Sequence, residues 1–293
     1  MISAEIIAIG TELLTPFRTD TNSLWLTDQL NSVGIQVKLK TVVGDDEDRL
    51  EEAIRDATRR SEIIISTGGL GPTEDDITRK VFAKVTGRQL MLDYDILAEI
   101  RERFARRGYQ MTPNNERQAL IPRGAAVLSN PNGTAPGIKI EQDGRLLVLL
   151  PGPPREMQPM FTDQVMPQLE RMSKGIRICR RVLKATGLGE SALDDMIAPI
   201  YRSYTNPVTT ILFTSAEVEI HLAGEAESAS KAEELVSELA EKLAEKLGDY
   251  VYSTNGESLE QVVGQRLALK RYTIATAESC TGGLVAERIT EIP

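Results

Sequence analysis

The sequence is poor in the residues on which several common kinds of site depend. It has one histidine, His221, and two cysteines, Cys179 and Cys280, in 293 residues. One histidine excludes a Cys/His zinc finger and limits a Ser-His-Asp triad to an arrangement built on His221. Two cysteines are too few for a disulfide framework and suit a reducing compartment, so we expect a cytoplasmic protein.

The chain also lacks a long apolar run and an excess of basic residues. No apolar run approaches the roughly 20 residues that span a bilayer, and the opening MISAEIIAIG is typical of a first β-strand rather than a signal peptide. The 34 basic and 43 acidic residues give a net charge of −9. Because phosphate neutralisation needs clustered Lys and Arg, we expect neither a membrane nor a nucleic-acid partner.

The pattern along the chain predicts three parts. The first 90 residues alternate short apolar runs with amphipathic helical patterns, which is typical of βαβ units and of a mostly parallel sheet with helices on both faces. We expect this α/β domain to cover residues 1–170 and a small α+β domain to cover 171–252. Residues 253–293 are too few to fold alone and are expected to begin a further α/β domain.

The two later parts carry more specific expectations. Leucines at four-residue steps predict an amphipathic helix over 225–247, and the apolar character of 272–277 predicts a strand. Residues 171–184 hold six basic and no acidic side chains, which favours a solvated or dimer-facing strand. His221 lies in an alternating strand pattern and is expected to be a partly buried structural residue.

A glycine-rich loop is the most informative motif of the first part. The sequence TGGLGPTEDDIT over 67–78 follows an apolar strand pattern and precedes a helix. Glycines there let the backbone approach a ligand, the next helix offers N–H groups to an anion, and the two aspartates suit a divalent cation. A tight turn with acidic residues at a helix start is the alternative. The acidic turn Asp45-Asp46 favours a site, because both loops are expected at one sheet edge.

Several motifs in a fixed order resemble the molybdopterin-binding fold and, more narrowly, the CinA family of competence/damage-inducible proteins. They are GTELL at 10–14, DTN at 20–22, VGDD at 43–46, GGLGPTEDDIT at 68–78, TPNN at 112–115, GTAPG at 133–137 and PGPP at 151–154. The last motif, TAESCTGG at 276–283, is similar to the start of the family's C-terminal amidase domain. The middle part resembles a KH module, but Gly187-Leu188-Gly189 lacks the Gly-x-x-Gly spacing of a nucleic-acid clamp.

The resemblance implies a fold and two activities. The fold is a three-layer molybdopterin-binding-like domain, a KH-like α+β domain and a truncated C-terminal segment. The activities are metal-dependent hydrolysis of ADP-ribose by the first domain and deamidation of nicotinamide mononucleotide, a step of NAD salvage, by the last. A small nucleotide substrate, a homodimer, a divalent metal with Mg²⁺ the expected ion, and a monovalent cation are also implied.

The resemblance further implies roles for individual residues. Those expected to act in catalysis are Asp76, Asp45 and Ser279. Those expected to bind substrate are Gly68, Gly69, Gly71, Pro72, Thr73, Glu12, Asn22, Gly152 and Pro153. Those expected to hold metal are Asp76, Asp75 and Asp46. One stretch departs from the family, because Thr15-Pro16-Phe17-Arg18 replaces a Gly-Gln type of turn, and Arg18 could reach a phosphate.

The role of Ser279 and the function of the first domain each have an alternative. Ser279, beside a glycine-rich turn into a helix, suits either a nucleophile or a helix cap. The lysine and tyrosine that the amidase uses are expected beyond Pro293, so we expect this chain not to deamidate nicotinamide mononucleotide. A hydrolase is the leading hypothesis for the first domain, and the alternative is a non-catalytic module that binds molybdopterin or a nucleotide. A DNA-uptake role is suggested only by the family's name and the basic stretch.

Overall fold

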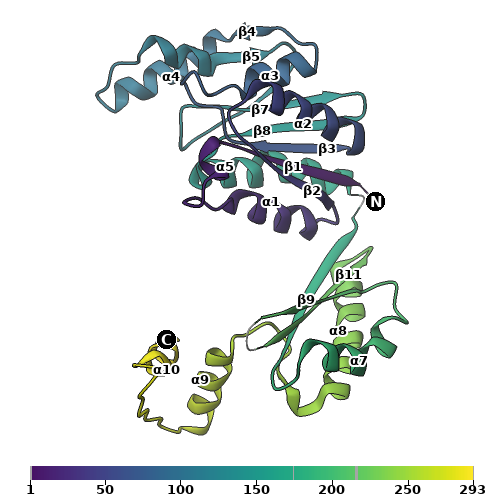
Figure 1. Cartoon of the computed structure of the whole chain (residues 1–293). Helices are drawn as coiled ribbons and strands as arrows, with labels where there is room; N and C mark the ends of the chain where they lie inside the picture. Colours follow the sequence, from purple (N-terminus) through teal and green to yellow (C-terminus); the bar gives the residue numbers. More distant parts are fainter. Residues whose placement is uncertain (1, 174, 215–216, 293) are drawn as a thin grey trace. The chain divides into compact units, whose positions relative to one another are not determined.

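The computed structural model describes residues 2–173, 175–214 and 217–292. The chain divides into two compact units, residues 1–175 and residues 176–293 (Figure 1). The short segment 253–293 is grouped with the second unit. Among the described residues, no helix has both the length and the apolar character needed to cross a membrane.

The first unit is built on a six-stranded sheet with the order β2-β1-β3-β8-β7-β6. Strands β2, β1, β3 and β8 run parallel, and β7 and β6 continue the sheet antiparallel. The bounds are β1 Ser3–Ile9, β2 Gln36–Val43, β3 Ile63–Thr67, β6 Ala126–Leu128, β7 Gly137–Gln142 and β8 Arg145–Leu150. The expectation of a mostly parallel α/β sheet is therefore confirmed.

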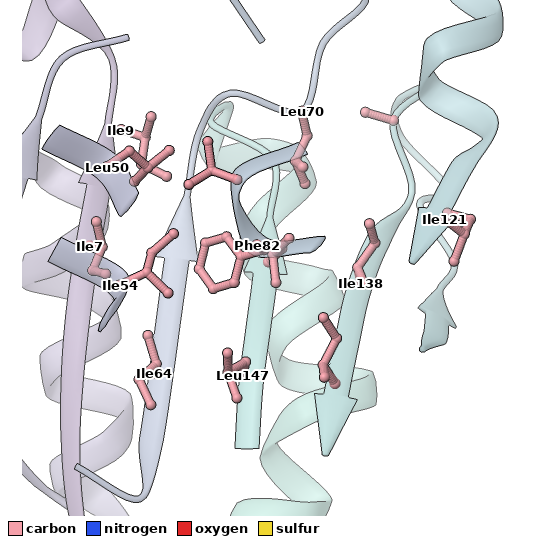
Figure 2. Packing of buried hydrophobic residues seen from close by; sticks show 14 of the residues in the cluster. Ile7, Ile9, Leu50, Ile54, Ile64, Leu70, Phe82, Ile121, Ile138 and Leu147 are labelled. Carbon is pink, nitrogen blue, oxygen red and sulfur yellow. The ribbon is translucent and has the colours of Figure 1, made fainter. Parts of the chain in front are cut away.

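Helices cover both faces of this sheet and make three layers (Figure 1). Their bounds are α1 Thr21–Ser32, α2 Glu47–Arg60, α3 Thr78–Val85, α4 Tyr94–Arg106, α5 Pro154–Met160 and α6 Met166–Met172, with a π-helical turn at Phe161–Val165 between the last two. Alternate residues of each central strand face opposite layers, so the strands are apolar throughout. On one face, Phe82 of α3 packs against strand residues such as Ile64 and Leu147 (Figure 2). On the other, Ile6 and Ile65 share a core with α1, α5 and α6.

The segment between α3 and β6 lies outside the six-stranded sheet. It contains β4 (Leu90–Leu92), which pairs with β5 (Leu120–Pro122), and the 3-10 helix η2 (Pro113–Ala119). A capping box begins η2, because the Thr112 hydroxyl and the Asn115 side chain bond across the first turn. A second 3-10 helix, η1 (Thr11–Leu14), directly follows β1. Both helices bring side chains to the carboxyl end of the sheet.

The second unit is an α+β fold on an antiparallel sheet with the order β10-β11-β9-β12. Its bounds are β9 Arg177–Ala185, α7 Glu190–Tyr201, β10 Val208–Phe213, β11 Val218–Ala226, α8 Ala229–Leu247, η4 Gly248–Tyr250, β12 Val251–Ser253, α9 Leu259–Lys270 and α10 Leu284–Thr290. The helix expected from Glu225 begins only at Ala229. The earlier start was wrong because Glu225 pairs with Ile178 in the sheet and Ser228 caps the helix.

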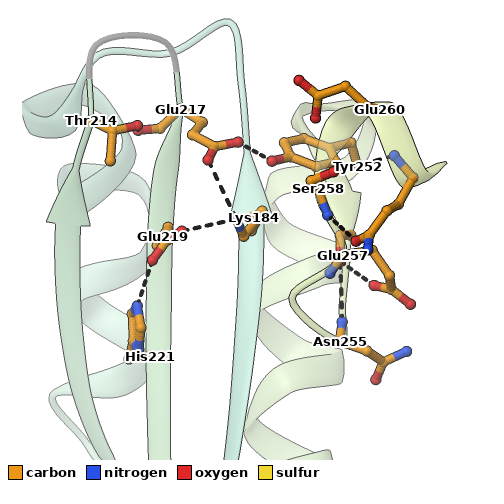
Figure 3. A network of polar contacts seen from close by, with 12 residues as sticks. Lys184, Thr214, Glu217, Glu219, His221, Tyr252, Asn255, Glu257, Ser258 and Glu260 are labelled. Carbon is orange, nitrogen blue, oxygen red and sulfur yellow. Dashed lines mark hydrogen bonds and ion pairs between the residues drawn. The ribbon is translucent and has the colours of Figure 1, made fainter. Parts of the chain in front are cut away.

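One face of this sheet packs against α7 and α8, and the opposite face carries a polar network (Figure 3). Lys184 of β9 forms ion pairs with Glu217 at 3.4 Å and with Glu219 at 2.9 Å. Hydrogen bonds to Lys184 and His221 hold the pKa of Glu219 below its ordinary value. The Tyr252 hydroxyl donates to Glu217, which ties β12 to the sheet. His221 is thus a partly exposed structural residue in a network.

The strand expected over residues 272–277 does not form. The segment has no regular structure between α9 and the turn before α10. A strand is stable only when a neighbour completes its hydrogen bonds, and no described strand lies beside this one. The apolar pattern was therefore insufficient to predict a strand, although the helix expected after Gly283 is present as α10.

Candidate functional site

A cavity of about 370 Å³ opens at the edge of the sheet where β1, β3 and β8 end. The residues that directly follow these strands, Gly10, Gly68 and Pro151, line it. This is the edge at which parallel α/β sheets bind their ligands. The cavity brings together ten of the predicted site residues: Glu12, Asp45, Gly68, Gly69, Gly71, Thr73, Asp75, Asp76, Gly152 and Pro153.

Four predicted residues lie elsewhere. Pro72 is in the glycine loop but does not line the cavity, and Asn22 lines a neighbouring one. The Asp46 carboxylate caps α2 by accepting from the N–H of Arg49 at 2.9 Å. Ser279 belongs to the second unit. Adjacent aspartates therefore differ, since Asp45 faces the cavity and Asp46 completes a helix end.

Steric contacts fix the glycine loop. Gly68 and Gly69 have φ angles of +107° and +64°. A Cβ at Gly68 would lie 2.0 Å from the carbonyl oxygen of Ile9, and one at Gly69 would lie 2.1 Å from the Thr78 hydroxyl. Only glycine fits both positions. Neither the Gly69 nor the Leu70 N–H has an acceptor among the described residues, so both remain available to a ligand in the cavity.

The carboxylate of Asp76 closes this loop on itself. Its Oδ1 accepts from the N–H of Gly71 at 2.7 Å. Its Oδ2 accepts from the N–H and the hydroxyl of Thr73 at 2.8 and 2.6 Å. A Cβ at Gly71 would lie 2.4 Å from Oδ2, so Gly71 must be glycine for this closure. Asp76 thus holds the shape of the loop and also lines the cavity.

A buried arginine that was not predicted from the sequence supports the glycine loop. Arg79 is 3% exposed and donates to the carbonyl oxygens of Leu70 at 2.6 Å and Gly71 at 2.7 Å. Burial lowers its pKa to about 10, so it stays charged at neutral pH. Its charge offsets that of Asp76 nearby. The only signal in the sequence was an arginine within an otherwise apolar helix face.

Five carboxylates line the cavity and differ in their partners. Asp45 accepts from the N–H and hydroxyl of Thr11, each at 2.9 Å, and Asp76 is held by the loop. Glu156 of α5, missed by the sequence analysis, accepts from Asn130 at 2.7 Å. The side chains of Glu12 and Asp75 are exposed and have no hydrogen-bond or ion-pair partner among the described residues. These two carboxylates are therefore free to act on a ligand.

The described residues contain no group of three or more His, Cys, Asp or Glu side chains placed to hold a metal ion. The cavity carboxylates therefore do not form a cage made by the protein alone. Mg²⁺ commonly binds one or two carboxylates and takes its other ligands from water and phosphate. The donors present fit that mode, in which Asp75 and Asp45 would supply the protein's oxygens.

A second cavity of about 290 Å³ adjoins the first and shares Ile9, Glu12 and Gly152 with it. Asn22 of α1 lines it and donates to the Thr67 hydroxyl at 3.0 Å and to the Gly152 carbonyl at 2.7 Å. The Oδ1 of Asn22 is buried without a partner among the described residues. Arg18 lines the same cavity.

The remaining wall of the first cavity comes from η2. Gln118 lines the cavity although its side chain is almost fully buried. An ion pair between Glu74 and Arg117 ties η2 to the glycine loop, and this contact lowers the pKa of Glu74. Gln118 was not among the site residues predicted from the sequence. The available signal was its position three residues after Asn115, which belongs to the capping box.

Ser279 lies in an exposed turn before α10. Its neighbour Glu278 accepts hydrogen bonds from the N–H groups of Gly283, Val285 and Ala286, at 3.1, 3.0 and 2.9 Å. These bonds hold the pKa of Glu278 below its ordinary value. Glu278, rather than Ser279, therefore caps α10 in this chain.

Three family models match the chain in order. Residues 5–171 match a model described as a probable molybdopterin binding domain. Residues 180–253 match the damage-inducible protein CinA KH domain, and residues 256–293 match the CinA C-terminal domain. These matches agree with the fold class expected from the sequence.

Individual relatives give the same result over the whole chain. A CinA-like protein of Solibacter usitatus is 46% identical over 292 residues, which are 100% of this chain and 70% of that protein. One from Koribacter versatilis is 48% identical over 99% of this chain and 71% of its own length. A crystal structure of the protein CinA, of unknown function, from Thermoplasma acidophilum is 35% identical, covers 58% of this chain and 98% of that one, and has a TM-score of 0.52. The chain belongs to the CinA family.

Proposed function

We propose that the first unit hydrolyses ADP-ribose or a related nucleotide pyrophosphate in a metal-dependent reaction. The observation that carries this proposal is the meeting of a glycine loop with free N–H groups and five carboxylates in one cavity. Ligand cavities typically measure about 300–1,000 Å³, and this cavity with its neighbour falls in that range.

The glycine loop would bind the pyrophosphate. The N–H groups of Gly69 and Leu70 are two donors without an acceptor among the described residues, and both residues line the cavity. Backbone N–H groups at such a turn stabilise anions without a positively charged side chain. Asp76 and Arg79 would act as positioning residues, because they hold the loop rather than a substrate.

Glu12 and Asp75 are the proposed groups that act on water. Either unpartnered carboxylate can accept a proton as the water oxygen bonds to one phosphorus and the bridging P–O bond breaks. The electron pair of that bond leaves with the second phosphate, so ADP-ribose and water give AMP and ribose 5-phosphate. A divalent cation bound at Asp75 and Asp45 would neutralise charge that develops on the phosphate oxygens. A monovalent cation stays a prediction without an assigned site.

A second candidate is a module that binds a nucleotide or molybdopterin without turnover. It is favoured by the engagement of Asp76 with three donors of its own loop, which leaves fewer unpartnered carboxylates than the sequence suggested. The two candidates make the same prediction for binding and opposite predictions for product release.

The test is to incubate the purified chain with ADP-ribose, with and without Mg²⁺, and to measure AMP and ribose 5-phosphate. We expect Asp75→Asn and Glu12→Gln each to lower turnover, because each removes a candidate base or metal ligand. The two changes together should lower it by roughly 100-fold or more. Asp163→Asn, an exposed aspartate outside the cavity, is the matched control and should retain full activity. Binding without product in the unaltered chain would favour the binding module.

Membership of the CinA family supports further proposals. Deamidation of nicotinamide mononucleotide is proposed for the C-terminal domain of the family, to which residues 256–293 are similar. A cytoplasmic homodimer is also proposed. Light scattering checks the dimer, because a monomer would give the chain's own mass of 32.3 kDa.

A further inference from the structure

We propose that Gln118 donates a hydrogen bond from Nε2 to a phosphate oxygen of the bound substrate, and that Asn115 positions it. This inference rests on the proposed function, since it names a recognition residue of the same cavity. The side chain of Gln118 is 2% exposed, yet it lines the cavity. Its Nε2 has no acceptor among the described residues and is not sealed from solvent, so this donor faces the cavity.

A chain of hydrogen bonds fixes which end of the Gln118 amide faces the cavity. The N–H of Thr112 can only donate, and it lies 3.3 Å from Oδ1 of Asn115. That contact assigns the oxygen of Asn115 to this side and leaves its Nδ2 to donate to Oε1 of Gln118, at 3.3 Å. The Nε2 of Gln118 must then point the other way.

Asn115 is suited to this positioning role because it is almost fully buried and hydrogen-bonded. It is 6% exposed and lies in the capping box that begins η2. The Thr112 hydroxyl lies 2.7 Å from the same Oδ1 and 2.5 Å from Oδ1 of Asn114, so the N–H of Thr112 is the donor that fixes the orientation of the Asn115 amide. Reversing it would leave buried donors facing one another, which is costly.

The chemistry of the cavity indicates what Gln118 would recognise. No Lys or Arg is among the described residues that line it, whereas five carboxylates do. Apart from a bound cation, the protein offers a phosphate there only neutral donors, and the N–H groups of Gly69 and Leu70 supply part of its shell. A buried amide donor adds a hydrogen bond without bringing a counter-charge. It also disfavours ligands that present only donors to this wall.

Gln118→Glu is a sharp test, because glutamate keeps the size of the side chain and can still accept from Asn115. The atom facing the cavity changes from a donor to an acceptor, and the side chain also gains a negative charge. Gln118→Met, which removes the donor without adding a charge, separates the two effects and should also lower the affinity. We expect the affinity for an α,β-methylene analogue of ADP-ribose, which cannot be hydrolysed at the pyrophosphate, to fall roughly 10- to 100-fold. Because a carboxylate at this buried position is costly, the melting temperature should fall in Gln118→Glu, and it is measured to confirm that the variant is folded at the assay temperature. Gln110→Glu, an exposed glutamine outside this cavity, is the matched control.

Asn115→Asp tests the positioning role without altering the cavity wall. An aspartate cannot donate to Oε1, so the Gln118 amide should reverse and turn its oxygen toward the cavity. We expect a loss of affinity similar to that of Gln118→Glu, and little further loss when the two changes are combined.

Calorimetric titration with the methylene analogue measures binding, and product release from ADP-ribose measures turnover separately. Wild-type affinity in Gln118→Glu overturns this inference and assigns Gln118 a structural role. Binding of the analogue without turnover of ADP-ribose overturns the proposed hydrolysis, while the affinities of the variants still decide the role of Gln118. Failure of the unaltered chain to bind the analogue overturns both.

Discussion

Two glycine-rich loops in this chain read alike in sequence and differ in structure. The loop after β3 and the loop before α10 each precede a helix and each contain a carboxylate that accepts several backbone hydrogen bonds. Asp76 holds Gly71 and Thr73, whereas Glu278 holds the first N–H groups of α10. Of the two loops, the first lines a cavity at the carboxyl end of the sheet.

The difference shows what turns a glycine loop into a site. The loop that contains Gly68 packs closely against β1 and α3, so neighbouring elements supply the other walls of the cavity. The turn around Gly282 has open space about it and no strand before it. There, Glu278 occupies N–H groups that would otherwise be free for a ligand. A glycine motif therefore predicts backbone geometry, while the surrounding fold decides whether a ligand can be bound.

The largest effect is expected when alanine replaces the glycine of each loop. Gly68→Ala would place a Cβ 2.0 Å from the Ile9 carbonyl oxygen, so β1 or β3 must shift. We expect a loss of about 3 kcal/mol or more of unfolding free energy. Gly282→Ala meets no atom within 4 Å and should cost only about 1 kcal/mol of local strain at a φ of +59°.

Trp25 makes this comparison measurable, because it is the single tryptophan and lies on α1 of the first unit. Its fluorescence during urea unfolding should shift to lower denaturant for Gly68→Ala and stay unchanged for Gly282→Ala. Gly152→Ala is the control within the cavity, since its Cβ would meet only Gly68 at an ordinary 3.6 Å. Equal shifts for Gly68→Ala and Gly152→Ala would contradict the steric argument.

A smaller effect is expected from neutralising the carboxylate of each loop. Asp76→Asn loses an acceptor for Gly71 or Thr73 and should destabilise the first unit by about 1–3 kcal/mol. Release of the loop should also lower turnover of ADP-ribose by about 100-fold. Glu278→Gln should leave both the Trp25 transition and this turnover unchanged. Full activity in Asp76→Asn would mean that turnover does not depend on the hydrogen bonds that Asp76 accepts from the loop.

The sequence predicted the parts of the site that are local in the chain. The apolar runs of β1 and β3 are buried on both faces, so their pattern was unambiguous, and the glycines after them follow from the same strands. The start of the helix expected from Glu225 could not be placed from the sequence alone. Ser228 is a good helix cap, but only the pairing of Glu225 with β9 shows that the helix begins after Ser228.

The parts that could not be predicted depend on tertiary contacts. Gln118 and Glu156 lie far along the chain from Gly68, and only the folded sheet brings them to its cavity. Asp45 and Asp46 are chemically identical neighbours, so sequence alone could not say that one caps α2 and the other faces the cavity. Arg79 is a charged residue that is buried, and the residues beside it in the sequence do not predict this burial.

The pH dependence of Glu278 offers a finer comparison. Hydrogen bonds from the N–H groups of Val285 and Ala286 lower its pKa. A carboxylate with a lowered pKa in the folded state stabilises the cap above the unfolded value of about 4.3, and this contribution is lost as pH falls through the lowered folded value. A carbon-13 titration of its carboxyl group should therefore give a midpoint below 4.3. A midpoint at or above 4.3 would mean that the cap does not form in solution.

The smallest effect is expected for Ser279→Ala. The hydroxyl of Ser279 is exposed and has no base among the described residues with which it shares a hydrogen bond. The N–H groups that could stabilise an oxyanion beside it are already bonded to Glu278. A nucleophile needs both a base and such donors. The unaltered chain and the variant should therefore release ammonia from nicotinamide mononucleotide at the same background rate. Release that is above background and abolished by Ser279→Ala would show that this turn rearranges into a working site.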